Sequence, residues 1–93
     1  MEAEQLDKID TQEALLKDLI EYIARSLVDD PTQVHIEQKR RGSSYHYELE
    51  VAKEDMGRVI GKNGRVANAI RVLLRVAAAR EEKRVSLDIV DPK

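Results

Sequence analysis

Apolar residues recur at helical spacing in the first third of the chain. From residue 11 they follow one another at three- and four-residue steps, which is the pattern of an amphipathic helix. The stripe consists of Leu15, Leu16, Leu19, Ile20, Ile23 and Leu27. Asp29-Asp30-Pro31 ends the helix, because proline disfavours a helical conformation in the residue before it. Residues 1–10 are expected to form a disordered acidic lead-in.

Two alternating stretches follow. The first covers residues 34–41, and the second covers residues 45–51, where Tyr45, Tyr47, Leu49 and Val51 are in phase. Alternation with period two is typical of half-buried strands. The two stretches flank Arg41-Gly42-Ser43-Ser44, so we expect a β-hairpin with a turn of more than two residues.

The second half of the chain predicts two helices and a last strand. Residues 53–60 form a short helical segment, residues 65–80 a longer helix, and residues 85–89 an alternating strand. On the longer helix, the spacing places Val66, Ala69, Ile70, Leu73 and Ala77 on one face. The order helix-strand-strand-helix-helix-strand predicts a single α+β domain over residues 11–93. Three strands would form one mixed sheet, with three helices on one face.

Composition narrows the function classes. A chain of 93 residues is expected to be one domain, and without cysteine it has no disulfide or cysteine-ligated metal. No apolar run is long enough to span a membrane, and the acidic start does not match a signal peptide, so we expect a cytoplasmic protein. We expect no cofactor and no small-molecule substrate. For His35 and His46, in the absence of a nearby carboxylate set, surface positions are favoured over a metal site.

Charge is unevenly distributed along the chain. The net charge is −2, but residues 1–30 carry nine acids and three bases, whereas residues 31–93 carry nine acids and thirteen bases. Residues 57–80 hold six bases and no acid. A local basic face matters more for binding a polyanion than the total charge does. The alternative is an ordinary solvated surface.

The segment Val59-Ile60-Gly61-Lys62-Asn63-Gly64-Arg65-Val66 carries the most informative chemistry. Glycines at both ends of a four-residue turn allow the backbone to bend tightly and to approach a ligand closely. Gly64 stands just before a helix, where N–H groups and the helix dipole suit a phosphate. Lys62 and Arg65 add positive charge there. A helix–helix connection without a ligand is the alternative.

These residues resemble a known family. An Ile-Gly-x-x-Gly turn between two helices is the signature of KH domains, whose GxxG loop clamps about four nucleotides. The element order matches the type II arrangement. Tyr22-Ile23-Ala24-Arg25-Ser26-Leu27-Val28-Asp29 and the stretch from Val51 to Arg65 resemble the KhpA family of small bacterial RNA-binding proteins. The resemblance covers residues 15–89, most of the chain.

The resemblance implies a function, a site and partners. The function would be binding of single-stranded RNA, as an RNA chaperone or post-transcriptional regulator linked to cell shape and cell-wall organisation. The partners would be a second copy or a larger KhpB/Jag/EloR-type protein. The hairpin is expected to stand across the binding groove from the GxxG turn. The expected RNA-binding residues are Arg58, Val59, Ile60, Gly61, Lys62, Asn63, Gly64, Arg65 and Val66, with Lys39, Arg40 and Arg41 from the hairpin.

Two other functions were weighed against RNA binding. A dimerisation or protein-interaction module would use the same apolar groove and basic helix. An enzyme is disfavoured, because no serine has a nucleophile–base context and the Walker pattern is absent. Tyr45 and Tyr47 share one strand face and are expected in the core or on the sheet surface rather than as stacking platforms for bases.

Overall fold

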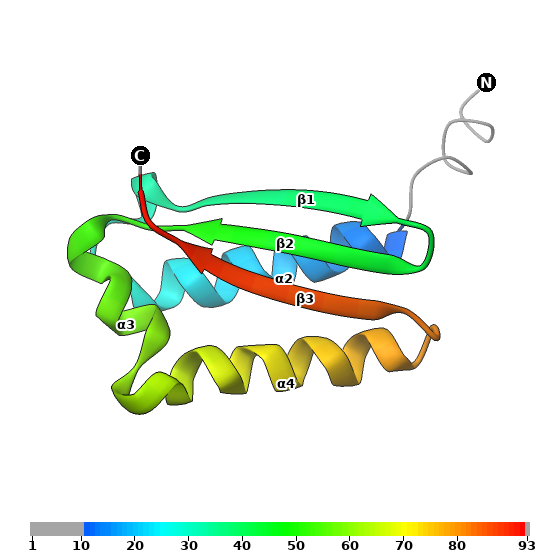
Figure 1. Ribbon diagram of the computed structural model, residues 1–93. Helices are drawn as coiled ribbons and strands as arrows, with labels where there is room; N and C mark the ends of the chain where they lie inside the picture. The colour runs from blue at the N-terminus through cyan, green and yellow to red at the C-terminus, as the bar shows by residue number, and fades with distance from the viewer. Residues whose placement is uncertain (1–10, 93) are drawn as a thin grey trace, which may run out of the picture.

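The computed structural model describes residues 11–92, and it contains the six elements expected from the sequence, in the expected order (Figure 1). The acidic lead-in expected over residues 1–10 lies outside the described residues. The elements are α2 (Thr11–Leu27), β1 (His35–Arg41), β2 (Ser44–Glu50), α3 (Met56–Ile60), α4 (Arg65–Ala79) and β3 (Arg84–Val90). Short 3-10 turns over Pro31–Gln33, Lys53–Asp55 and Lys62–Gly64 join some of them.

The sheet is mixed, as predicted, with the strand order β1-β2-β3. β1 and β2 are antiparallel, and β2 and β3 are parallel, so that Tyr47 lies between Gln38 and Leu87. Parallel neighbours need a crossover connection, and α3 and α4 provide it. Figure 1 shows α2 and α4 running along the sheet, with α3 at the end where β2 leaves it. The α+β class and the three-helix cover are thereby confirmed.

The hairpin is tighter than the sequence suggested. Arg41 pairs with Ser44, which leaves Gly42 and Ser43 as a two-residue loop, and Gly42 has a φ of 56°. A two-residue hairpin with glycine at positive φ in its first position is the type II′ geometry. The prediction of a longer turn was wrong because Gly-Ser satisfies this geometry without the more familiar Asn-Gly pair.

The core lies between the helices and one face of the sheet. Tyr45, Tyr47 and Leu49 of β2 are all buried, as their common phase predicted, and the Tyr47 hydroxyl donates to the Glu13 carbonyl at 2.8 Å. The opposite face of β2 carries His46 and Glu48 toward solvent. Two of the three tyrosines are therefore core residues, which removes them as stacking surfaces for bases.

The face that α4 buries differs from the predicted one. Ala67, Ile70, Leu74 and Ala78 are buried, whereas Ala69 and Leu73, which were expected inside, are exposed. The prediction failed because α4 has apolar residues on two sides, so the spacing of its apolar residues is compatible with burial of either side. The second side is a row of exposed apolar residues, Ala69, Val72, Leu73 and Val76, called here the outer face of α4.

Within residues 11–92, none of the helices combines the length and the apolar character that crossing a bilayer requires.

Candidate functional site

The turn over residues 61–64 has a backbone that few residue types adopt. Gly61, Asn63 and Gly64 have φ values of 77°, 57° and 76°. Only glycine, and to a lesser degree asparagine, occupies this left-handed region readily. Three such residues in a row of four reverse the chain between α3 and α4, so local sequence chemistry alone accounts for the turn.

The two glycines are needed for different reasons. A Cβ built on Gly61 would stand 2.4 Å from Val66 Cγ2 and 2.8 Å from Val66 N, which is an overlap. A Cβ on Gly64 would meet only Asn68 Nδ2, at 3.9 Å. Gly61 therefore lets the turn close against the first residues of α4, whereas Gly64 leaves an open surface that a ligand backbone can approach.

The tip of the turn offers unpaired amides. The Gly64 N–H donates to the Gly61 carbonyl at 3.1 Å, and the Arg65 N–H donates to the Lys62 carbonyl. In the part of the chain that the structure describes, this leaves the amides of Lys62 and Asn63 without a protein acceptor. The side chains of Lys62, Asn63 and Arg65 are exposed beside them. Free amides, two cations and the N-terminus of a 15-residue helix form a site suited to an anion.

The apolar residues around the turn divide into two groups. Ile60 and Val66 are half-buried and pack on the core with one side. Val59 is 0% exposed, so its expected contact with RNA must be corrected: it supports the turn from inside. The helix α3 has only five residues, which is too short for the sequence pattern to distinguish its buried side from its solvent side.

A buried carboxylate fixes the start of α3. Asp55 is 2% exposed and accepts the N–H groups of Asp29 and Asp30 at 3.0 and 3.1 Å, and Arg58 Nε lies 3.2 Å from it. The hydrogen bond from the Asp29 amide, with those from Asp30 and Arg58, lowers the pKa of Asp55 against the opposing effect of burial. This carboxylate thereby ties the start of α3 to the residues that follow α2.

Arg58 is engaged in the same contact. Its guanidinium also lies 2.8 Å from Asp29 Oδ2, so it bridges two carboxylates. The sequence placed Arg58 among the phosphate ligands, but its charge is already balanced by Asp29 and Asp55. Its role here is to position α3.

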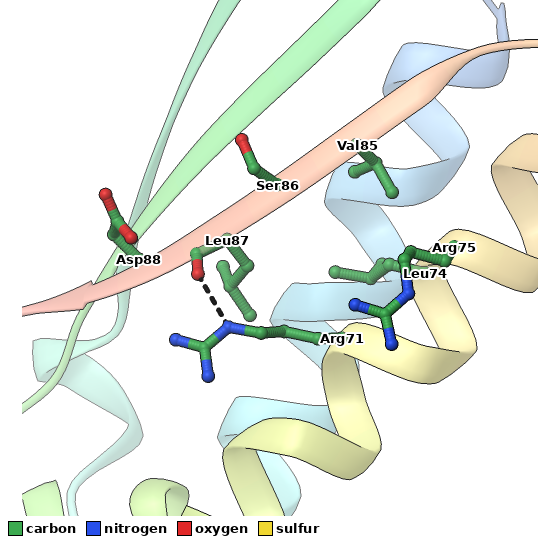
Figure 2. Close-up of a pocket in the computed structure, with 7 residues that line it drawn as sticks. All are labelled: Arg71, Leu74, Arg75, Val85, Ser86, Leu87 and Asp88. Carbon is green, nitrogen blue, oxygen red and sulfur yellow. Dashed lines mark hydrogen bonds between the residues drawn. The ribbon is translucent and has the colours of Figure 1, made fainter.

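A groove lies between the middle of α4 and β3. It has a volume of about 290 Å³ and is lined by Arg71, Leu74, Arg75, Val85, Ser86, Leu87 and Asp88. Figure 2 shows Arg71 and Arg75 on the α4 side of this α4–β3 groove, with Arg71 Nε donating to the Leu87 carbonyl at 2.9 Å. Among the strands that the structure describes, β3 pairs only with β2, so its other edge faces the groove with backbone groups that have no partner strand there.

A polar line connects the turn to the groove. Positions 64, 68, 71 and 75 lie on one face of α4, because they are three or four residues apart. Arg71 Nη1 donates to Asn68 Oδ1 at 3.3 Å, and Asn68 is the side chain nearest to Gly64. Asn68, Arg71 and Arg75 were not among the site residues expected from the sequence. Their spacing from Gly64 was the signal that could have found them.

The hairpin residues lie elsewhere. The Arg84 N–H donates to the Ser43 carbonyl at 3.0 Å, which joins the hairpin to the start of β3 and so to the C-terminal end of α4. The 61–64 turn is at the other end of this 15-residue helix, about 22 Å away (Figure 1). The expected position of Lys39, Arg40 and Arg41 across the groove from the turn was therefore wrong. Lys39 instead lies 3.7 Å from both Glu37 and Glu48, and Arg40 Nε donates to the Gly42 carbonyl.

Comparison with known proteins agrees with this geometry. A family model described as KhpA/KhpB, KH domain matches residues 17–89. The RNA-binding protein KhpA of Clostridium perfringens is 48% identical over 75 residues, which cover 81% of this chain and all of that protein. The RNA-binding protein KhpA of Halalkalibacterium halodurans is 47% identical and matches 82% of this chain. That of Chlamydia caviae is 46% identical and matches 84% of this chain. Both relatives are matched over their whole length. With a family model over most of the described residues and relatives this similar, the chain belongs to the KhpA/KhpB family of KH domains.

Proposed function

We propose that this protein binds single-stranded RNA, with the sugar–phosphate backbone on the 61–64 turn and bases in the α4–β3 groove. The observation that carries the proposal is the pair of unpaired amides at Lys62 and Asn63, at the N-terminus of α4 and beside Arg65. The relatives' name, RNA-binding protein, supports it. Action in the cytoplasm as an RNA chaperone or post-transcriptional regulator is the corresponding cellular role.

Charge supports one binding face. Six bases and no acid occur in residues 57–80, and Arg71 and Arg75 of this segment line the groove. The solvent face of the sheet instead carries Glu37, Glu48 and Asp88 in neighbouring positions of the register. Phosphates are attracted to the first face and repelled by the second. An RNA strand would therefore run along α4 rather than across the sheet.

Asn63→Asp tests the proposal most cleanly. Asparagine and aspartate have nearly the same shape and both tolerate the left-handed backbone, so the variant adds one negative charge at the tip and little else. We expect its affinity for a labelled single-stranded oligonucleotide, measured by fluorescence anisotropy, to fall about tenfold or more, which corresponds to about 1.4 kcal/mol.

The matched control is Gln38→Glu, which makes the same charge change at an exposed position of β1, the opposite edge of the sheet from β3. Its affinity should stay close to that of the unchanged protein. Equal losses in both variants would mean that only net charge matters and that the turn is not the binding site. No loss in either variant would also contradict the proposal.

The outer face of α4 favours a second function, pairing with another copy. Val72, Leu73 and Val76 are 47%, 54% and 62% exposed, and they form one apolar row on a rigid helix. Contiguous exposed apolar residues mark interaction surfaces in soluble proteins. The same face on two copies would be self-complementary about a two-fold axis. A larger KH-containing partner would compete for this face.

Val76→Glu separates pairing from RNA binding. We expect this variant to be monomeric in size-exclusion chromatography with light scattering, at concentrations where the unchanged chain is a dimer, and to keep its RNA affinity per chain. A monomeric unchanged chain up to about 1 mM, the concentration that matches about 4 kcal/mol of association free energy, would refute self-pairing.

A further inference from the structure

Three ligand-type side chains meet on the solvent face of the sheet, at the margin of the α4–β3 groove that Asp88 also lines. His46 Nε2 lies 3.7 Å from Glu48 Oε2 and 3.4 Å from Asp88 Oδ2, and the donor atoms of all three residues are within 4.8 Å of one another. Four ligands at about 2.1 Å from a zinc ion in a tetrahedron stand about 3.4 Å apart. The two distances from His46 Nε2 are therefore close to the edge length of such a tetrahedron.

The strand register produces this cluster. His46 and Glu48 are two residues apart on β2 and so share a face, and Asp88 of β3 stands opposite Glu48. The expectation that no carboxylate set lies near either histidine was wrong for His46. The sequence alone does not show that Asp88 lies beside His46 and Glu48, because the pairing of β2 with β3 is not visible in it.

The histidine ring is already oriented. His46 Nδ1 lies 2.6 Å from Ser86 Oγ, so the serine occupies that nitrogen and Nε2 faces the two carboxylates. A second group bonded to the far nitrogen is the usual support of a metal-binding histidine, since it fixes the ring and the tautomer. In the tautomer whose Nδ1 donates to the serine, the lone pair of Nε2 is available to a metal ion.

The carboxylates around His46 would be stabilised by a cation. Glu37, Glu48 and Asp88 form one row across the three strands, called here the acid row, and like charges directly opposite each other destabilise a sheet. Lys39 lies between Glu37 and Glu48, at 3.7 Å from each. Within residues 11–92, Asp88 has only His46 as an ion-pair partner. A divalent ion at Nε2 would neutralise the uncompensated end of the row.

We propose that His46, Glu48 and Asp88 bind a divalent transition-metal ion of the zinc class, with Ser86 as the positioning residue and water completing the coordination. Imidazole and carboxylate together suit Zn²⁺ better than the harder Mg²⁺ or Ca²⁺, which take oxygen ligands. The site would join β2 to β3 on the solvent face of the sheet, and it borders the α4–β3 groove, which Ser86 and Asp88 also line.

Titration of the full chain with Zn²⁺ alone, followed by calorimetry and by the imidazole proton signals in NMR spectra, tests the site. We expect one ion per chain and a shift of the His46 signals but not of those of His35. His46→Asn and Asp88→Asn should each weaken binding more than tenfold, and Ser86→Ala about tenfold. All three side chains lie at the surface or half-buried, so these variants should fold, which amide spectra verify.

His35→Asn is the matched control, because His35 occupies the same sheet face on β1 beside Glu50. It should leave the affinity unchanged, and a large excess of Mg²⁺ should not displace the zinc. The proposal is overturned by zinc binding that survives both His46→Asn and Asp88→Asn, by an equal loss in His35→Asn, or by no binding at millimolar Zn²⁺.

Discussion

Gly61 and Gly64 look equivalent in the sequence, and the structure separates them. Both have positive φ, but a side chain on Gly61 would overlap Val66, whereas Gly64 opens to solvent and to Asn68. A glycine pair can be found by pattern, but which glycine is needed for packing cannot, because the answer depends on the first turn of α4. Placing an acidic side chain at both glycines together would therefore not distinguish a loss of folding from a loss of binding.

Alanine substitution at each glycine gives the first prediction. Gly64→Ala should lower the free energy of unfolding by about 1–2 kcal/mol, the cost of a left-handed alanine. Gly61→Ala should lower it by more than that, because Gly61 has a φ of 77° and a ψ of 170°, a region that is nearly restricted to glycine, and the overlap with Val66 adds to this cost. Urea unfolding of both variants measures the difference. Equal losses would show that the turn closes less tightly than described.

Asp55 predicts how stability depends on pH. Hydrogen bonds from Asp29, Asp30 and Arg58 lower its pKa below the ordinary value of 3.8. The folded state therefore binds this proton less readily than the unfolded state does. Its contribution is complete above the unfolded pKa, and it is lost as the pH falls through the lower folded pKa.

We therefore expect Asp55→Asn to be less stable at pH 7 and to lose less stability than the unchanged protein between about pH 5 and pH 2. Urea midpoints across this range measure both effects. Asp91→Asn, a change at an exposed aspartate, is the control and should leave the curve unchanged. A variant with the same acid slope as the unchanged protein would refute this role of Asp55.

Among the elements, α4 shows where periodicity stops being informative. The boundaries of α2, β2 and α4 followed from proline, glycine and alternation, because these signals are local. The buried side of α4 could not be predicted in this way, because the helix has two apolar faces. One face contains Ala67, Ile70 and Leu74, and the other contains Ala69, Leu73 and Val76. Tertiary packing against β3 and α2 chooses between them.

Two neighbouring leucines test this assignment. Leu74 is 1% exposed and Leu73 is 54% exposed. Leu74→Ala should destabilise the protein by about 2–5 kcal/mol, as buried leucines do, and Leu73→Ala by less than about 1 kcal/mol. Thermal or urea unfolding of both variants decides it, at a protein concentration low enough to avoid pairing. The opposite order would restore the face that the sequence favoured.

At the scale of the whole molecule, charge is divided between two faces. α4 and the 61–64 turn present Lys62, Arg65 and Arg75, whereas the sheet presents the acid row to the opposite side. The sequence showed the basic segment, because its residues are consecutive. It did not show that the basic hairpin lies at the opposite end of α4 from the turn, or that acids from three strands form a row, because both depend on the sheet register.

Salt dependence measures which cations meet phosphates. Each lost phosphate contact on a single strand should reduce the slope of log affinity against log salt by about 0.7. Lys62→Ala with Arg65→Ala should therefore reduce it by about 1.4 and weaken binding without changing the preferred sequence. Lys39→Ala with Arg41→Ala, at the far end of α4, should change the slope less. An equal reduction of the slope in both double variants would mean that the hairpin also contacts phosphates.

An NMR titration of the full chain with short single-stranded RNA at low salt tests whether RNA lies on the 61–64 turn and in the α4–β3 groove. We expect the largest amide shifts at residues 62–66, continuing along α4 to Arg75 and along β3 over residues 85–88, with little change on β1. Shifts confined to the solvent face of the sheet or to the outer face of α4 would contradict it, and so would a titration in which the amides of Lys62 and Asn63 do not move.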